Sequence, residues 1–237
     1  MTKTLAVLLA CFTVAGATSL QAQEKPIRFV GFNAGAQPTS HKFSTSSSFP
    51  LYEEAVLINS NHSVDGGAIF GVNGGYQIWR SIVLAGEYSW FSSHGNAAVA
   101  ATVPNPLFFN QPITVNPGVP NLERQEKAFH LSAMWFKTFT DHVSGAVFVG
   151  PTFTHVSQQL ATTGTVDAGT QNLTMTTTKA SGTAVGVNVG VEGTYMVTPR
   201  YGGALFIRYA GGSTDLPNAS DVPSGGFQIG VGARVRF

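Results

Sequence analysis

The sequence predicts an all-β protein: a closed antiparallel up-and-down transmembrane β-barrel of eight strands, with short turns at one end and long loops at the other. Three observations carry this prediction. Apolar residues alternate with small or polar ones, short and long connections take turns along the chain, and charged residues are scarce. They make up only 11% of the 237 residues, against roughly 25% in soluble globular chains.

Composition also argues against two classes of protein. Hydrophobic residues reach 43% of the chain, whereas disorder requires low hydrophobicity together with high charge. The formal net charge is +1, and lysines and arginines form no cluster, so a basic nucleic-acid-binding protein is not expected.

The first element is a predicted export signal over residues 1–23, followed by a single domain over 24–237. Lys3 provides a positive start, an apolar core covers 5–16, and small residues follow it, which is typical of a cleaved secretory signal. The apolar core is too short to cross a bilayer as a helix. Cleavage is predicted after Ala17, Ala22 or Gln23.

The cysteine content narrows the chemistry. Cys11 is the only cysteine and lies inside the predicted signal. The mature chain is therefore expected to have no disulfide, zinc–thiolate site or cysteine nucleophile. A faint lipoprotein-type cleavage box ahead of Cys11 is the alternative reading.

Eight segments with a period of two follow the signal. Within 182–197, four valines share one face, and glycine, asparagine and glutamate share the other. Such alternation predicts a strand with two chemically different sides. The first segment is the least regular, because Arg28 and Phe29 interrupt its pattern. The predicted strands cover 27–37, 67–79, 82–92, 127–138, 143–156, 182–197, 201–211 and 225–237.

The connections between these segments alternate in length. Short ones lie near Arg80, Asp141 and Pro199. Those rich in Ser, Thr, Asn and Pro are predicted to be loops, and they cover about 38–66, 93–126, 157–181 and 212–224. A count of ten strands stays open, because residues 43–58 are compatible with a hairpin and the second long connection with further strands.

The apolar face of the strands is predicted to meet lipid. The opposite face is mostly Gly, Ala, Asn, Ser and Thr, and residues 67–79 carry no charge, which suits a crowded interior better than a surface in water. Backbone polar groups in lipid must be paired, so the sheet has to close on itself. We therefore expect Val187→Arg to prevent assembly and Asn188→Ala to be mild.

Two further patterns fit this sidedness. The sequence G-x-N-x-G occurs at 31–35, 71–75 and 186–190, with glycine and asparagine on the predicted inner face. Aromatic residues fall at both ends of the strands, as in the two interfacial girdles of membrane barrels, the alternative being core aromatics of a β-sandwich. The predicted girdles are Tyr76, Trp79, Trp135, Tyr195, Tyr201 and Phe237 at the short-turn end, and Phe70, Trp90, Phe129, Phe153, Tyr209 and Phe227 at the long-loop end.

On these features the sequence resembles the small eight-stranded outer-membrane β-barrels of Gram-negative bacteria, the porin-like or OmpA-like barrel domains. The segments 74–80 and 232–237 carry the resemblance together with the signal and the loop pattern. It implies a location in the outer membrane among its lipids. It also implies that Phe237, with Val235 and Val231, forms an assembly signal read by the barrel-assembly machinery.

Charged residues on the predicted inner face form a candidate lumen network. Glu87, His130, Glu192 and Arg208 lie at similar depth, and Arg234 lies closer to the short turns. Glu192 and Arg208 are on neighbouring strands and are expected to lie near each other. Buried charges must be paired, so these residues are predicted to plug the lumen. The alternative is a narrow channel for small solutes, gated by Arg208 changing carboxylate partners.

A third reading is a lipid A-modifying hydrolase. His155 and Ser157 lie at the loop end of one strand, an arrangement that resembles the outer-membrane lipid A deacylases, and a base beside a hydroxyl is what acyl hydrolysis requires. No orienting acid is identifiable, so catalytic residues are not predicted and the protein is not expected to be an enzyme. The other histidines are scattered without metal-ligand spacing, so neither metal nor cofactor is predicted.

The function predicted from these observations is a structural or surface-interaction role through the long extracellular loops. Loops on a rigid scaffold commonly carry recognition, so an extracellular ligand is the expected partner, and nucleic acid is not.

Overall fold

The computed structural model describes residues 26–51, 53–105, 107–167 and 172–237. Within those ranges no helix has the length and apolar character needed to cross a membrane. The predicted export signal lies outside the described residues. The strands are β1 (Arg28–Gln37), β2 (His41–Leu51), β3 (Glu54–Val64), β4 (Gly67–Trp79), β5 (Ile82–Val103), β6 (Ile113–Val115), β7 (Gly118–Thr138), β8 (Val143–Val166), β9 (Leu173–Met196), β10 (Tyr201–Leu216) and β11 (Ala219–Arg236).

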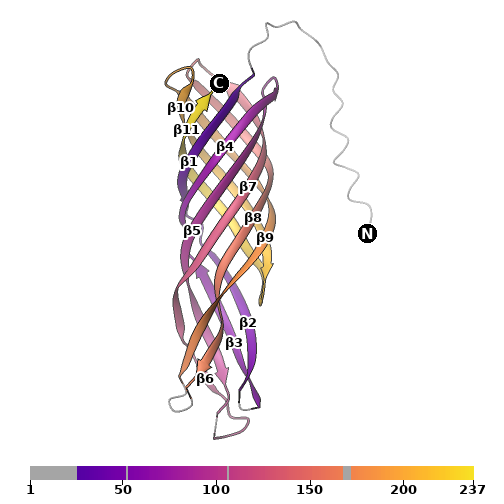
Figure 1. The fold of residues 1–237 in the computed structure, drawn as a ribbon, viewed down its shortest axis with the longest axis vertical. Helices are drawn as coiled ribbons and strands as arrows, with labels where there is room; N and C mark the ends of the chain where they lie inside the picture. The colour runs from indigo at the N-terminus through magenta and orange to yellow at the C-terminus, as the bar shows by residue number, and fades with distance from the viewer. Residues whose placement is uncertain (1–25, 52, 106, 168–171) are drawn as a thin grey trace, which may run out of the picture.

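Eight of these strands form a closed ring, which confirms the predicted barrel. Antiparallel neighbours follow the order β1, β4, β5, β7, β8, β9, β10 and β11, and β1 closes the ring against β11. Ala34 of β1 faces Phe70 of β4 on one side and Val231 of β11 on the other. The strands are strongly tilted around the long axis of the molecule (Figure 1).

The apolar face of the strands lies on the outside of the ring, as predicted. The four valines of β9 are exposed there, whereas Asn188 and Glu192 on the opposite face are buried. All twelve residues of the two predicted aromatic girdles are exposed. The outside of the ring is therefore a continuous apolar belt, with aromatic side chains toward both of its edges.

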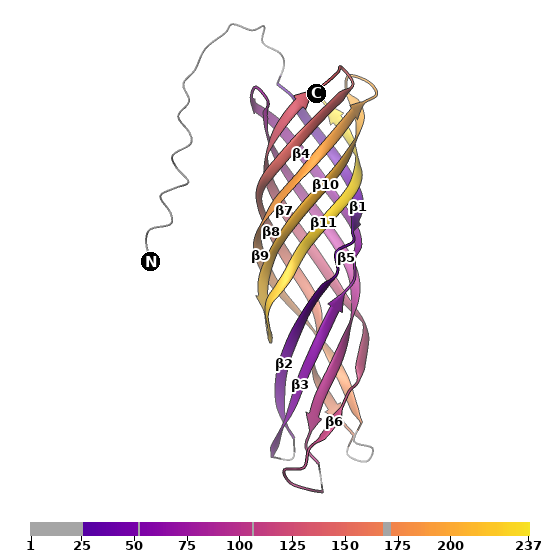
Figure 2. The ribbon, with the colours of Figure 1, turned by 180° about the vertical axis from the view of Figure 1, so that it is seen from behind.

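The prediction of long loops was wrong for most of their length. Strands β5, β8 and β9 have 22, 24 and 24 residues, about twice what a tilted strand needs to cross a bilayer. They continue beyond the belt (Figure 2), where β5 pairs with β3 of the β2–β3 hairpin and with β6. Ser, Thr and Asn form the water-facing side of these strands, and threonine has a high strand propensity. A hairpin over 43–58 thus forms, but outside the ring of eight.

We call this second half the distal extension, comprising residues 38–66, 92–127, 155–183 and 212–224. It has apolar clusters of its own between its strands. The first contains Val56, Ile58, Ala97, Val99, Ala101, Val103, Leu122, Ala161 and Leu173, and the second Phe43, Val64, Leu160, Ala180, Leu216, Ala219 and Val222. At the opposite end of the molecule, a third cluster around Phe29, Met134 and Phe148 fills the barrel near the short turns.

Candidate functional site

Large polar side chains in the lumen lie opposite inward-facing glycines of the neighbouring strand. Between β1 and β4, Gly31 faces Asn73 and Asn33 faces Gly71. A Cβ atom added at Gly31 would lie 2.6 Å from the Asn73 side-chain oxygen, and one at Gly71 would lie 3.0 Å from a Glu87 carboxylate oxygen. The G-x-N-x-G motif is therefore a packing device, because each glycine leaves room for a polar side chain in a narrow lumen.

The same pairing recurs around the ring. Arg208 on β10 faces Gly190 on β9, and Asn188 on β9 faces Gly150 on β8. The Asn188 amide donates to the carbonyls of Gly150 and Pro151 at 3.0 and 3.1 Å, and its oxygen accepts from Ser132 at 2.8 Å. Asn188 is thus a fully paired buried group that joins β7, β8 and β9.

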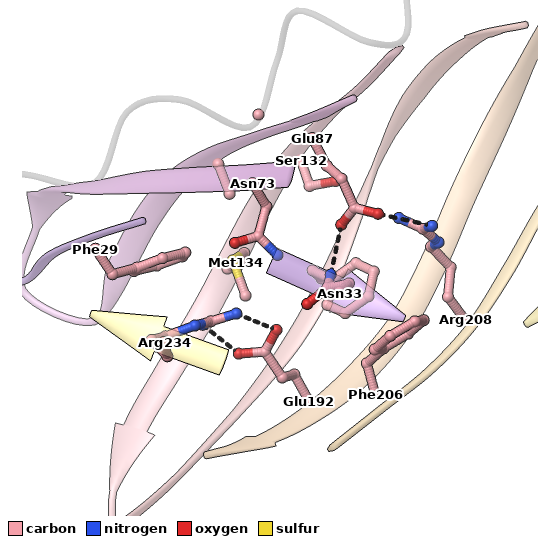
Figure 3. Close-up of a pocket in the computed structure, with 13 residues that line it drawn as sticks. Phe29, Asn33, Asn73, Glu87, Ser132, Met134, Glu192, Phe206, Arg208 and Arg234 are labelled. Carbon is pink, nitrogen blue, oxygen red and sulfur yellow. Dashed lines mark hydrogen bonds and ion pairs between the residues drawn. The ribbon is translucent and has the colours of Figure 1, made fainter. Parts of the chain in front are cut away.

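Two ion pairs cross the middle of the lumen (Figure 3). Arg208 Nη2 lies 2.9 Å from Glu87 Oε1, and Arg234 holds Glu192 through both carboxylate oxygens, one of them at 2.7 Å. Asn33 donates to the second oxygen of Glu87 at 3.2 Å. The expected proximity of Glu192 and Arg208 is therefore not used as an ion pair: Arg208 reaches across the lumen to Glu87, and Arg234 takes Glu192.

His130 lies in the same buried layer but is not part of an ion pair. Its Nε2 is 3.0 Å from the Ser89 hydroxyl and its Nδ1 is 2.8 Å from the Thr152 hydroxyl. Hydroxyl groups act as donor or acceptor, so both ring nitrogens are satisfied by neutral partners. The histidine ties β5, β7 and β8 together.

A chain of hydrogen bonds that was not predicted from the sequence leads from this layer toward the distal extension. Arg208 donates to Gln228 at 2.7 Å, Gln228 donates to Gln37 at 2.8 Å, and Gln37 donates to the Gly225 carbonyl at 2.8 Å. The Gly225 amide in turn donates to Glu126, at 2.9 Å, which is paired with the fully buried Arg124 at 2.8 Å.

Arg124 and Glu126 were missed because they fall in a segment predicted to be a loop. The signal that identifies them is parity: residues 122, 124, 126 and 128 continue the inward face of the strand that begins at 127 in the prediction. They close the lumen at the end that continues into the distal extension, next to the apolar clusters there.

Little space remains inside the barrel. One cavity of about 30 Å³ lies beside the two central ion pairs, among residues that include Asn33, Asn73 and Arg234 (Figure 3). A second cavity, of about 10 Å³, lies next to His130 and Gln228, on the side toward the distal extension. A single water requires roughly 10–15 Å³ measured in this way. The lumen therefore has room for isolated waters between its ion pairs.

The His155–Ser157 pair has no catalytic geometry in the structure. His155 faces outward on β8, opposite Lys127 and Thr183, and Ser157 faces Gln125 and Ser181. Among the described residues, no hydrogen bond joins this histidine to the serine or to a carboxylate. In that same part of the chain, no group of three His, Cys, Asp or Glu residues is arranged to hold a metal ion.

The residues of the predicted assembly signal lie at the short-turn end of the belt. Val231 and Phe237 are exposed and Val235 is half-buried. The backbone amide of Phe237 donates to the Arg28 carbonyl at 3.2 Å. The end of β11 is therefore held beside β1 at the seam where the ring closes.

The distal extension presents a polar outer face. On the β2–β3 hairpin, Ser44 donates to Asn61 and Ser46 donates to Asn59, both at 2.8 Å. Of the large apolar residues exposed in the described part of the extension, Leu57 lies on this hairpin and the other three, Leu107, Phe108 and Phe109, lie together on the β5–β6 connection. The extension thus has a polar surface with one apolar tip.

Comparison with known proteins shows a likeness in fold to solved structures. No family model and no curated protein matches the chain. Neisserial surface protein A superposes with a TM-score of 0.51 at 14% identity, over 90% of this chain and all of that one. OprG of Pseudomonas aeruginosa gives a TM-score of 0.47 at 11% identity, over 88% of this chain and 95% of its own. The likeness to the neisserial protein shows that this chain is similar in fold to small outer-membrane β-barrels.

Proposed function

We propose that the protein is an outer-membrane β-barrel of a Gram-negative bacterium, that its lumen does not conduct, and that its distal extension is a rigid surface for interaction outside the cell. The observation that carries the proposal is the change of chemistry on the outside of the strands. On β5 the outward residues are Leu84, Tyr88 and Trp90 in the ring, and Ser92, His94 and Asn96 in the extension.

This change fits a molecule whose ring is surrounded by lipid and whose extension is surrounded by water. An apolar belt flanked by aromatic residues suits acyl chains between two interfaces. A polar outer face over an apolar core suits water. Lipids of the outer membrane are then the partners of the belt, and the end of β11 is the segment offered to the barrel-assembly machinery.

The lumen supports a structural role better than a channel. Six of its charged residues form three ion pairs, and separating a buried pair leaves an uncompensated charge at a cost of about 3–5 kcal/mol. Two cavities of about 30 and 10 Å³ are far from a continuous aqueous path. The ion pairs and the hydrogen-bonded chain above them hold the eight strands together as a rigid base for the extension.

Two measurements test the proposal. Purified barrel in a planar lipid bilayer is expected to give no conductance steps, and steps at neutral pH would favour the channel. On intact cells, a cysteine introduced at Gln111 or Ser48 is expected to react with a membrane-impermeant thiol reagent, whereas one introduced at Asp141, in a short turn, is expected to stay unreacted. The reverse labelling pattern would refute the outward direction of the extension.

A further inference from the structure

The most unusual surface of the distal extension is its tip, formed by Leu107, Phe108 and Phe109. These side chains are 80%, 56% and 72% exposed. They are consecutive, so they point in different directions around the turn between β5 and β6 rather than along one face. We propose, on the basis of the function proposed above, that this tip inserts into the interface of a second, apposed bilayer whose headgroups are zwitterionic, such as phosphatidylcholine.

The shape of the tip favours lipid over a protein pocket. Three large side chains offer about 500 Å² at most, below the roughly 800 Å² that each partner of a stable protein interface buries. Their exposure on every side also leaves no single complementary face. A bilayer has no such requirement, because it surrounds whatever enters it. The turn lies at the end of the molecule opposite the C-terminus, farthest from the apolar belt (Figure 1).

Two backbone amides of the tip are paired with side chains at its base. The Leu107 amide donates to the Asn105 side-chain oxygen at 2.9 Å. The Asn110 amide donates to Glu54 Oε1 at 3.0 Å. Backbone groups without partners are costly in lipid, and these two are satisfied by side chains at the base of the turn. Insertion to the depth of the three apolar residues therefore leaves these two amides paired.

Charge selects the kind of bilayer. Between His94 and Glu123 the sequence contains no Asp, Glu, Lys or Arg, so the tip itself is neutral. The Glu54 side chain, at the start of β3, bonds the Asn110 amide at the base of the tip, and the extension as a whole has eight acidic and four basic residues. An anionic membrane would repel this surface. A second copy of the chain would bring the same carboxylates against it, which argues against tip-to-tip dimers.

The test uses the absence of cysteine from the described chain. Gln111→Cys, labelled with an environment-sensitive fluorophore and held in nanodiscs, reports on the tip. Titration with phosphatidylcholine vesicles is expected to raise and blue-shift the emission. Replacing Leu107, Phe108 and Phe109 by serine is expected to weaken binding about tenfold or more. Leu57→Ser, the control on the hairpin surface, is expected to bind as the parent does. Heat-modifiable gel mobility checks that every variant is folded.

A second arm tests the charge selection. Vesicles that also contain an anionic phospholipid are expected to bind less tightly than phosphatidylcholine alone, and Glu54→Gln is expected to reduce the difference. Glutamine keeps an oxygen acceptor for the Asn110 amide, so the turn is retained. Equal binding to the two kinds of vesicle would overturn the selection.

Three outcomes overturn the inference itself. They are no response to vesicles, an equal response from the triple serine variant, and a response that grows with protein concentration without vesicles, which would indicate self-association. If the labelled tip ignores vesicles while Gln111→Cys still reacts on intact cells, the lipid partner is wrong and the proposed function stands. If Gln111→Cys does not react on cells, the proposed function fails as well.

Discussion

The ring and the distal extension are built from the same strands but meet different surroundings. Along β5 the inward and outward faces never exchange: odd-numbered residues point in from Val83 to Val103. What changes, close to Phe91, is the chemistry of each face. Apolar residues lie on the outer face in the ring and on the inner face in the distal extension. Alternation therefore tells that a strand exists, whereas the identity of the polar residues tells which solvent it meets.

The same difference applies to the interior. In the ring, ion pairs and hydrogen bonds cross the lumen and join strands that are not neighbours. In the extension, Val56, Ile58 and Val99 pack as in a soluble β-sandwich. The ring thus has its apolar side chains outside and polar pairing in its middle, whereas the extension has an apolar core stabilised by the hydrophobic effect. Matched substitutions in the two halves are therefore expected to have opposite consequences.

The largest effect is expected from an arginine on the outer face of β9. Val187 is 60% exposed in the apolar belt, and arginine near the middle of a bilayer costs about 2–4 kcal/mol. We expect Val187→Arg to abolish assembly, measured as loss of heat-modifiable mobility in the membrane fraction. Ser181→Arg is on the same face of the same strand, in the extension beside the existing Lys179. It is expected to change stability by less than about 0.5 kcal/mol.

The second effect is expected from the core of the extension. Ile58 is 1% exposed and its neighbour Leu57 is 51% exposed. Ile58→Ala removes buried methyl groups and is expected to destabilise the extension by about 2–5 kcal/mol, seen as faster proteolysis of the β2–β3 hairpin. The ring is expected to keep its gel mobility. Leu57→Ala is the control, and equal proteolysis of the two variants would contradict the assignment of the apolar side to the interior.

Strand β9 and the β2–β3 hairpin differ in how well their structure could be predicted from the sequence. The alternation of Val185 to Val191 with glycine and asparagine identified the outer side of the ring, because few other arrangements place so little charge on both faces. The extension was not predicted, because Ser, Thr and Asn serve equally in loops and on the wet face of a strand. The Glu87–Arg208 pair was not predicted either, since it joins β5 and β10, which are not neighbours in the ring.

A third prediction concerns the lumen, and it revises the expectation that Asn188→Ala is mild. Asn188 is fully buried and its amide donates to three acceptors. Alanine leaves Ser132 and two carbonyl groups without their partner, at about 1–3 kcal/mol. We expect a lower urea midpoint for unfolding in detergent. Asn59→Ala, an exposed asparagine of the extension, is the matched control, and a midpoint shift as large as that of Asn188→Ala would argue against lumen pairing as the source of stability.

The smallest effect is expected from acid, and it is predicted here for the β2–β3 hairpin of the extension. His62 on β3 is buried, stacked on Phe43 with ring centroids 4.8 Å apart, and its Nε2 is 3.2 Å from the Thr45 hydroxyl. Burial lowers the pKa of His62 to about 4, below the ordinary value of about 6.5 that it regains when the hairpin opens. The opened hairpin therefore takes up a proton first as pH falls. Its closed form is fully stable above about pH 6.5 and loses stability progressively toward pH 4.

Hydrogen exchange of the β2–β3 amides between pH 4 and pH 8, corrected for the intrinsic rate, measures this loss. Protection is expected to decrease below about pH 6.5 in the parent and to change less in His62→Gln, which keeps a polar group near Thr45 without the titration. His94→Gln, at an exposed position of β5, is expected to leave the parent profile unchanged. If His62→Gln retained the full acid dependence, the proton would bind elsewhere. The acid sensitivity would then no longer separate the extension, where the buried His62 has one hydrogen-bond partner, from the ring, where His130 has two.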